Sequence, residues 1–144
     1  MQNLKFRTVI VALGAWLILP AGALAETVVV VSSKSPAASL SAEQVADIFL
    51  GRLATLPGSG PAVPVDQPEG AAVREDFYSK VTGKTAAQLK AHWAKQIFTG
   101  KGQPPKEVAD ANGIKKLIAE NPNIVGYMGR QDVDASVKVL FSVK

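Results

Sequence analysis

The sequence of 144 residues contains few combinations of side chains that could perform catalysis. His92 is the only histidine, which excludes a catalytic pair of histidines and a metal site with two histidine ligands. A Ser-His-Asp arrangement would have to use His92, yet no serine lies in a Gly-x-Ser-x-Gly turn. The chain has no cysteine, which excludes thiol chemistry, disulfides and cysteine-ligated metal. We therefore expect a protein that is not an enzyme and uses no cofactor or metal; an enzyme of the cell envelope is the alternative.

Two further patterns are expected to be surface features. Gly83-Lys84-Thr85 resembles the end of a phosphate-binding P-loop, but Tyr78 stands where that motif requires its first glycine. The paired carboxylates Glu75-Asp76 fall on a predicted helix, where a solvated face explains them. Neither pattern predicts a reaction.

One segment has the layout of an anion-binding site. A short strand is predicted over residues 62–66, and residues 67–74 (Gln-Pro-Glu-Gly-Ala-Ala-Val-Arg) then open a helix. A small-residue turn at a helix N-terminus presents backbone N–H groups and the positive end of the helix dipole. Ordinary capping is the alternative, because Glu69 is expected in the first turn, where its carboxylate would satisfy the dipole.

The N-terminal segment is typical of a secretory signal peptide. Lys5 and Arg7 precede an uncharged apolar stretch, and Ala23 and Ala25 supply small side chains for cleavage after Ala25. The apolar stretch is shorter than the roughly 20 residues that span a bilayer. We expect residues 1–25 to be removed, residues 26–144 to form one periplasmic domain, and no membrane insertion after cleavage.

The charge of the expected mature chain is nearly balanced. Lys5 and Arg7 account for two of the 16 basic residues, which leaves 14 basic against 12 acidic side chains in residues 26–144. A strongly basic face is the usual sign of nucleic-acid binding. We therefore expect no nucleic-acid partner.

Hydrophobic periodicity and capping signals predict a mixed α/β fold. Thr27–Val31 is a β-branched run typical of a central strand, and Ser41 and Thr85 each open a capping box that starts a helix. A further helix is expected from about Pro68, and Leu89, Trp93 and Ile97 are expected to form one buried stripe. Residues 52–61 and 101–106 are expected to lack regular structure. The other predicted elements are a helix over 111–120 and strands over 124–128 and 137–141, which together give a mixed sheet flanked by helices.

Several of these segments resemble the phosphate-type substrate-binding proteins of ABC transporters. The strand Val28–Val31 is followed by Ser41–Gly51, which ends in Ile-Phe-Leu-Gly, and Ile124–Tyr127 reads Ile-Val-Gly-Tyr. Between them, similar residues occur in the family's order: Pro64-Val65, Arg74, Phe77, Trp93 and Phe98-Thr99-Gly100. The resemblance implies one lobe of a type 2 periplasmic binding protein, and binding without catalysis. The other lobe has no room in residues 26–144.

The resemblance weakens at the ligand motif itself. Where phosphate-binding members have an arginine and Ser-Gly-Thr, this chain has Gln67 and Glu69-Gly70-Ala71. A carboxylate repels phosphate, and the hydroxyl donors are missing. We therefore predict a binding module without tight phosphate binding, which binds a small solute or another envelope protein. The alternative is genuine capture of phosphate or another small solute for an ABC transporter, with half of the cleft supplied by a second chain. The candidate ligand-binding residues are Ser32, Ser33, Gln67, Glu69, Gly70, Ala71 and Arg74.

Overall fold

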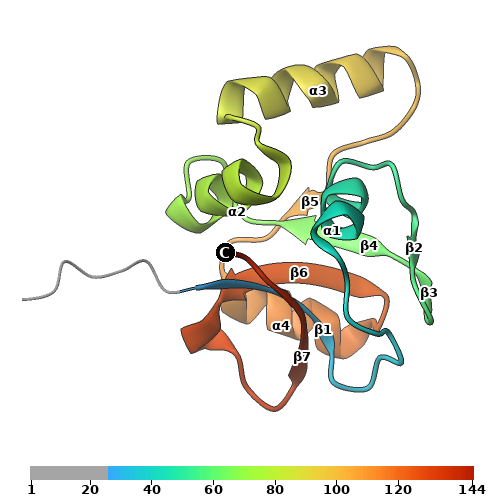
Figure 1. The fold of residues 1–144 in the computed structure, drawn as a ribbon, viewed down its shortest axis with the longest axis vertical. Helices are drawn as coiled ribbons and strands as arrows, with labels where there is room; N and C mark the ends of the chain where they lie inside the picture. Colours follow the sequence, from blue (N-terminus) through green and yellow to red (C-terminus); the bar gives the residue numbers. More distant parts are fainter. Residues whose placement is uncertain (1–25) are drawn as a thin grey trace, which may run out of the picture.

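The computed structural model describes residues 26–144, so the predicted signal peptide lies outside the described residues. A five-stranded sheet in the order β5-β4-β6-β1-β7 forms the centre of the fold, and helices cover both of its faces (Figure 1). This arrangement confirms the expected mixed α/β class. The elements are β1 (Thr27–Ser32), α1 (Ala42–Phe49), β2 (Thr55–Leu56), β3 (Gly60–Pro61), β4 (Val63–Asp66), α2 (Ala72–Thr82), α3 (Ala86–Phe98), β5 (Lys106–Glu107), α4 (Ala111–Glu120), β6 (Ile124–Gly129), a 3-10 turn (Arg130–Asp132) and β7 (Val137–Ser142).

The strand directions decide which loops share an end of the sheet. Strand β1 runs antiparallel to β6 and β7, whereas β4 runs parallel to β6 and to the short edge strand β5. The C-terminal end of β4 therefore lies beside the C-terminal end of β6 and the N-terminal end of β1. All six residues of β1 are buried, which confirms that it is a central strand.

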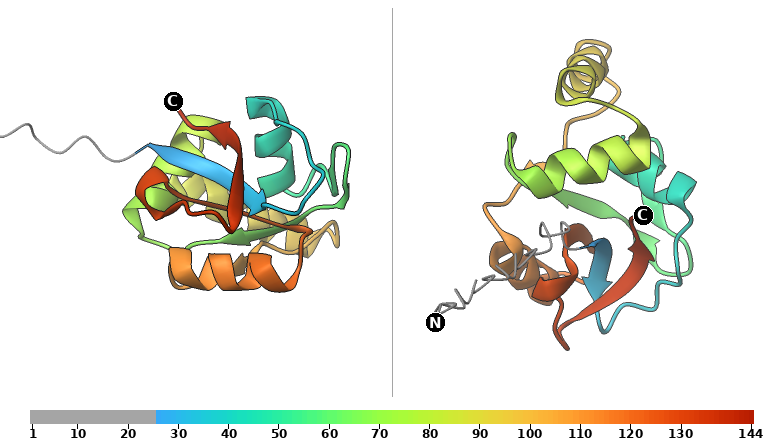
Figure 2. Two further views of the ribbon diagram at one scale, coloured as in Figure 1. Left: turned by 90° about the horizontal axis from the view of Figure 1, so that it is seen from below. Right: turned by 60° about the vertical axis from the view of Figure 1, so that its left-hand side comes forward.

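Alternate residues of β1 point to two separate cores, as the period of two in a strand requires. Val29 and Val31 pack with α1 and α2 on one face of the sheet, and Val28 and Val30 pack with α4 on the other. Figure 2 shows α4 on the face opposite α1 and α2. Helix α4 contributes Ile114 and Ile118, both almost completely buried.

Both capping boxes are present. The Ser41 hydroxyl accepts a hydrogen bond from the Gln44 backbone N–H at 3.1 Å, and the Gln44 side chain accepts one from the Ser41 N–H at 2.9 Å. Thr85 and Gln88 repeat this exchange at the start of α3. Gly51 follows α1 in the left-handed conformation with φ 76°, as expected of a glycine after a helix.

The start of α2 differs from the expectation. The helix begins at Ala72 and not near Pro68, because residues 68–71 form a turn in which the Ala71 N–H donates to the Pro68 carbonyl at 3.0 Å. Gly70 has φ 86°, which breaks any helix that started earlier. Glu69 therefore precedes the helix, and the acidic residue in the first turn is Glu75.

Two other expectations are wrong in part. Leu89 and Trp93 are buried, but Ile97 is 48% exposed because α3 extends beyond the core that its first turns contact. The segments expected to lack regular structure contain a small β2–β3 hairpin and strand β5. None of these short strands exceeds two residues, too few for a hydrophobic period to show.

Helix α3 lies on the outer side of α2, away from the sheet (Figures 1 and 2). Its contact with the body is narrow: the Trp93 ring lies against Gly51, and His92 Nε2 is 3.0 Å from the Leu50 carbonyl oxygen. His92 is thus a half-buried residue that packs against the body of the protein. Within residues 26–144, no helix is long and apolar enough to cross a membrane.

Candidate functional site

Asp66, the last residue of β4, is the centre of a buried polar cluster. Its side chain is 2% exposed. It accepts hydrogen bonds from the Tyr78 hydroxyl at 2.7 Å, from the Tyr127 hydroxyl, and from the Gln67 backbone N–H at 2.8 Å. These donors come from α2, β6 and the turn after β4, so one carboxylate joins three elements.

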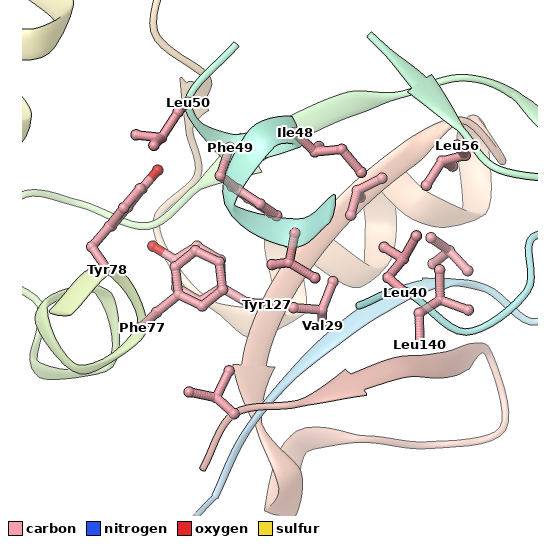
Figure 3. Packing of buried hydrophobic residues seen from close by; sticks show 14 of the residues in the cluster. Val29, Leu40, Ile48, Phe49, Leu50, Leu56, Phe77, Tyr78, Tyr127 and Leu140 are labelled. Carbon is pink, nitrogen blue, oxygen red and sulfur yellow. The ribbon is translucent and has the colours of Figure 1, made fainter. Parts of the chain in front are cut away.

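The two tyrosines belong to a packed aromatic group on the α1 and α2 face of the sheet (Figure 3). Tyr127 stacks on Phe77 with ring centroids 4.0 Å apart, and Phe49 of α1 meets both rings edge-on. Packed rings leave the hydroxyls little freedom to rotate away from Asp66. The carboxylate therefore meets donors that are already in place.

Arg74 and Gln67 connect this cluster to the surface. The Arg74 guanidinium lies 3.7 Å from the Asp66 carboxylate and 2.9 Å from the Glu107 carboxylate, and it also donates to the Gln67 carbonyl at 3.3 Å. The Gln67 side chain donates to the Tyr127 carbonyl at 2.9 Å. Two predicted ligand-binding residues thus already have partners within the chain.

Burial determines the protonation behaviour of the cluster. Desolvation raises the pKa of Asp66, although the two tyrosine hydroxyls, Arg74 and the Gln67 N–H all act in the opposite direction. Desolvation, followed by the nearby Asp66 charge, raises the pKa of Tyr78 and Tyr127 well above the ordinary value for tyrosine. Both hydroxyls remain protonated donors, so neither tyrosine is an activated nucleophile or base. The cluster holds α2 and β6 together through the Asp66 carboxylate.

The turn before α2 and the first turn of that helix bring together five of the seven candidate residues, from Gln67 to Arg74. Ala71 is the N-cap of α2 and provides no side-chain hydrogen bond to the helix. Glu69 and Gly70 are exposed at the turn. The expectation that Glu69 caps the dipole from inside the first turn is therefore wrong. The N-terminus of α2 is left without a side-chain cap.

Two clefts border this N-terminus. The smaller, of about 350 Å³, lies between the starts of α2 and α4 and the end of β6. Its charged side chains are Asp76, Asp110 and Asp132, and no lysine or arginine lines it. The larger, of about 680 Å³, lies between α2 and α3. Its lining residues include four carboxylates, from Glu69, Glu75, Asp76 and Glu107, and three cationic side chains, from Arg74, Lys84 and Lys90.

Ser32 and Ser33 are not near these clefts. Ser32 is the last residue of β1 and Ser33 follows it. Because β1 is antiparallel to β6 while β4 is parallel to it, this end of β1 lies opposite the end of the sheet that carries Gln67. Ser33 donates its N–H to the Ser136 carbonyl beside β7. The structure therefore does not bring Ser32 and Ser33 together with the other five candidate residues.

Asp66, Tyr78 and Tyr127 are not predicted as a group from the sequence. Their hydrogen bonds join residues 12 and 61 positions apart along the chain. The signal in the sequence is the position of Asp66 at the end of a predicted strand. A carboxylate that is buried there requires hydrogen-bond or charge partners.

The fold is that of one lobe of the phosphate-type substrate-binding proteins, which confirms the resemblance seen in the sequence. A solved structure described as a phosphate ABC transporter substrate-binding protein with bound phosphate, from Clostridium perfringens, matches 81% of this chain with a TM-score of 0.64 and 22% identity. An ABC-type phosphate transport receptor from Vibrio cholerae matches 81% with a TM-score of 0.65 and 22% identity. PstS from Borrelia burgdorferi matches 81% with a TM-score of 0.60 and 11% identity.

This chain spans less than half of each of those proteins: 44%, 46% and 46% of their lengths, in the same order. A single-lobe relative would show this ratio. No family model matches the sequence, and no curated protein matches it.

Proposed function

We propose that this chain is an exported, non-enzymatic binding module of the periplasm that shares the lobe fold of phosphate-type substrate-binding proteins but does not bind phosphate tightly. Its partner is an envelope protein or a small solute. The fold supports a relation to binding proteins, and the buried state of the Asp66 cluster supports a role without catalysis.

The charge of the cleft at the start of α2 is the observation that carries the phosphate part of this proposal. Three aspartates and no cationic side chain line that cleft, so an oxyanion that approached the uncapped helix would meet like charge. The guanidinium of Arg74, which belongs to the same helix, already pairs with Asp66 and Glu107. The helix dipole contributes only about 1 kcal/mol toward an anion. Repulsion by the carboxylates therefore opposes the attraction of the dipole, although Asp76 also pairs with Lys80 at 2.8 Å.

Calorimetric titration of the exported protein with inorganic phosphate tests the proposal. We expect no binding tighter than about 1 mM, near −4 kcal/mol. Micromolar affinity would contradict our account of Gln67–Ala72 and would favour the alternative, in which this chain captures phosphate for an ABC transporter with a second chain closing the cleft. Calorimetric titration with a panel of amino acids and sugars tests whether the partner is a small solute.

Export is tested separately by the intact mass of the protein recovered from the periplasm. Cleavage after Ala25 leaves Glu26 as the N-terminal residue, because Ala23 and Ala25 provide the small side chains that signal peptidase requires. A mass that includes residues 1–25 would contradict the proposed export with cleavage.

A further inference from the structure

Helix α3 and the loop after it carry an unusual charge. Residues 84–106 contain five lysines and no aspartate or glutamate, whereas all 12 acidic residues of the chain lie elsewhere. Within the described residues, none of these five lysines forms an ion pair. They are Lys84, Lys90, Lys95, Lys101 and Lys106.

The outer face of α3 is also apolar. Phe98, at the end of the helix, is 92% exposed, and the neighbouring Ile97 is 48% exposed. Ala87, Ala91 and Ala94 are exposed at spacings that place them in line with Phe98 along one side of the helix. Lys90 and Lys95 flank this line on opposite sides. We call the line of Ala87, Ala91, Ala94 and Phe98, together with the two flanking lysines, the α3 outer face.

We propose that the α3 outer face is a docking surface for an acidic amphipathic helix of a protein partner. The charge supports an acidic occupant, because unpaired lysines border the apolar line on both sides. The side-chain sizes support a helix, because alanines let a second helix approach closely while Phe98 inserts between its side chains. This inference rests on the proposed role as a binding module and assigns the place where a protein partner binds.

A lipid surface fits the same face less well. Membrane insertion depends on the apolar area that leaves water, and three alanines and one phenylalanine offer little. Lys84 and Lys90 line the cleft between α2 and α3, so the lysines are not confined to one plane that a bilayer could contact. Acidic side chains on a helix can reach lysines on both sides of the apolar line, as in the flanking positions of a coiled coil.

The test uses the exported protein and a labelled, designed peptide of about 20 residues, long enough to be helical in isolation. The peptide carries a leucine stripe flanked by glutamates, and its matched counterpart carries lysines in place of the glutamates. Fluorescence anisotropy should show that the glutamate peptide binds and the lysine peptide does not. Phe98→Ala should weaken binding by about tenfold, as loss of a central aromatic anchor does. The double variant Lys90→Glu/Lys95→Glu should reverse the preference between the peptides.

Matched controls separate the face from general effects of charge and hydrophobicity. Lys116→Glu/Lys144→Glu changes the net charge equally at exposed lysines outside α3, and Val63→Ala removes a 42% exposed apolar side chain from β4. Both should bind the glutamate peptide like the wild type. Failure of the wild type to bind it, or equal losses in the controls, would overturn the inference.

The same protein variants also test two other occupants of the α3 outer face, a membrane and a second copy of this chain. Binding to vesicles that contain phosphatidylglycerol without binding to the peptide would assign the face to a membrane. Sedimentation that shows a dimer lost in Phe98→Ala would assign it to a second copy of this chain. Either result overturns the inference, and neither alters the phosphate titration, which concerns the clefts beside α2.

Discussion

The consecutive helices α2 and α3 differ in how far their side chains are buried and hydrogen-bonded within the protein. The inner side of α2 places Phe77 and Tyr78 in the aromatic core, where the Tyr78 hydroxyl has a partner in Asp66. Helix α3 contacts the body mainly through Leu89 and Trp93, and the indole N–H of Trp93 is buried with no hydrogen-bond partner among the described residues. Its outer side carries the exposed Phe98.

This difference indicates which surface of the protein gains more from binding a partner. Around α2, Arg74 is paired with carboxylates, and the smaller cleft at the start of the helix is lined by carboxylates alone among charged side chains, so an incoming anion gains little there. Around α3, lysines without ion pairs lie beside exposed apolar side chains, so a complementary partner gains both charge pairing and burial. Resemblance to phosphate-binding proteins directs attention to the first region, whereas the physical chemistry favours the second.

The largest effects should follow from the cores of the two helices. Phe77→Ala should lower the free energy of unfolding by about 3–5 kcal/mol, because the ring is fully buried against Phe49 and Tyr127. Trp93→Ala should cost less, about 3 kcal/mol, because it also removes an indole N–H that lacks a partner. Urea melts measure both. A larger loss for Trp93→Ala would reverse the comparison, and a loss below about 1 kcal/mol would mean that Trp93 is not a core residue.

Gly51→Ala tests the narrow contact between α3 and the body. An added Cβ would lie 3.0 Å from Trp93 Cη2, in a backbone conformation with φ 76° that costs about 1–2 kcal/mol for residues with a side chain. Gly83→Ala is the matched control, since its φ is 69° and nothing lies within 4 Å of the added atom. Both should lose stability, but only Gly51→Ala should accelerate amide exchange in α3. Equal exchange in the two variants would contradict the proposed contact.

The buried carboxylate should give a stability contribution that depends on pH. Because the pKa of Asp66 is raised in the folded state, the folded protein takes up a proton before the unfolded chain does as pH falls toward the ordinary value of 3.8. The contribution of Asp66 to stability therefore increases as pH decreases through that window. Asp66→Asn should remove this contribution in urea melts collected across the window.

Asp134 is a control of opposite sign. Hydrogen bonds from Ser136 and Lys115 hold the pKa of this exposed carboxyl at about 2, so its contribution is lost as pH falls from 3.8 toward 2. Asp134→Asn should leave the Asp66 window unchanged. If Asp66→Asn showed the same dependence of unfolding free energy on pH as the wild type, this would contradict the raised pKa of Asp66.

The smallest effect should come from restoring part of the ligand motif. Glu69→Ser/Ala71→Thr removes one carboxylate and returns two hydroxyls, which should improve phosphate affinity by about tenfold at most. The three aspartates of the smaller cleft remain and limit the gain. Glu43→Ser, on the exposed side of α1, removes the same charge elsewhere and should have no effect in calorimetry. An equal gain in this control would mean that net charge and not the site is responsible.

Local signals in the sequence were sufficient for much of the fold. The capping boxes at Ser41 and Thr85, helix 111–120 and the strand β1 depend on residues within a few positions of one another. The start of α2 was placed too early because a proline suits both a helix N-terminus and the turn that Gly70 completes here.

The site was harder to predict because strand order decides it. Ser32 ends strand β1 and Gln67 follows strand β4, and only the opposite directions of β1 and β4 place them at opposite ends of the sheet. Ile97 continues the helical period of Leu89 and Trp93, but periodicity does not indicate where the core ends. The Asp66 cluster depends on Tyr127, and no local pattern links residues 61 positions apart.

The most direct test is a pair of amide-resolved NMR titrations of the protein. Our account predicts that phosphate, up to about 1 mM, causes no saturating shifts in residues 67–74, while the glutamate-flanked peptide shifts the amides of α3 around Ala91 and Phe98. Saturating shifts in residues 67–74 at micromolar phosphate, with α3 unaffected by the peptide, would contradict it.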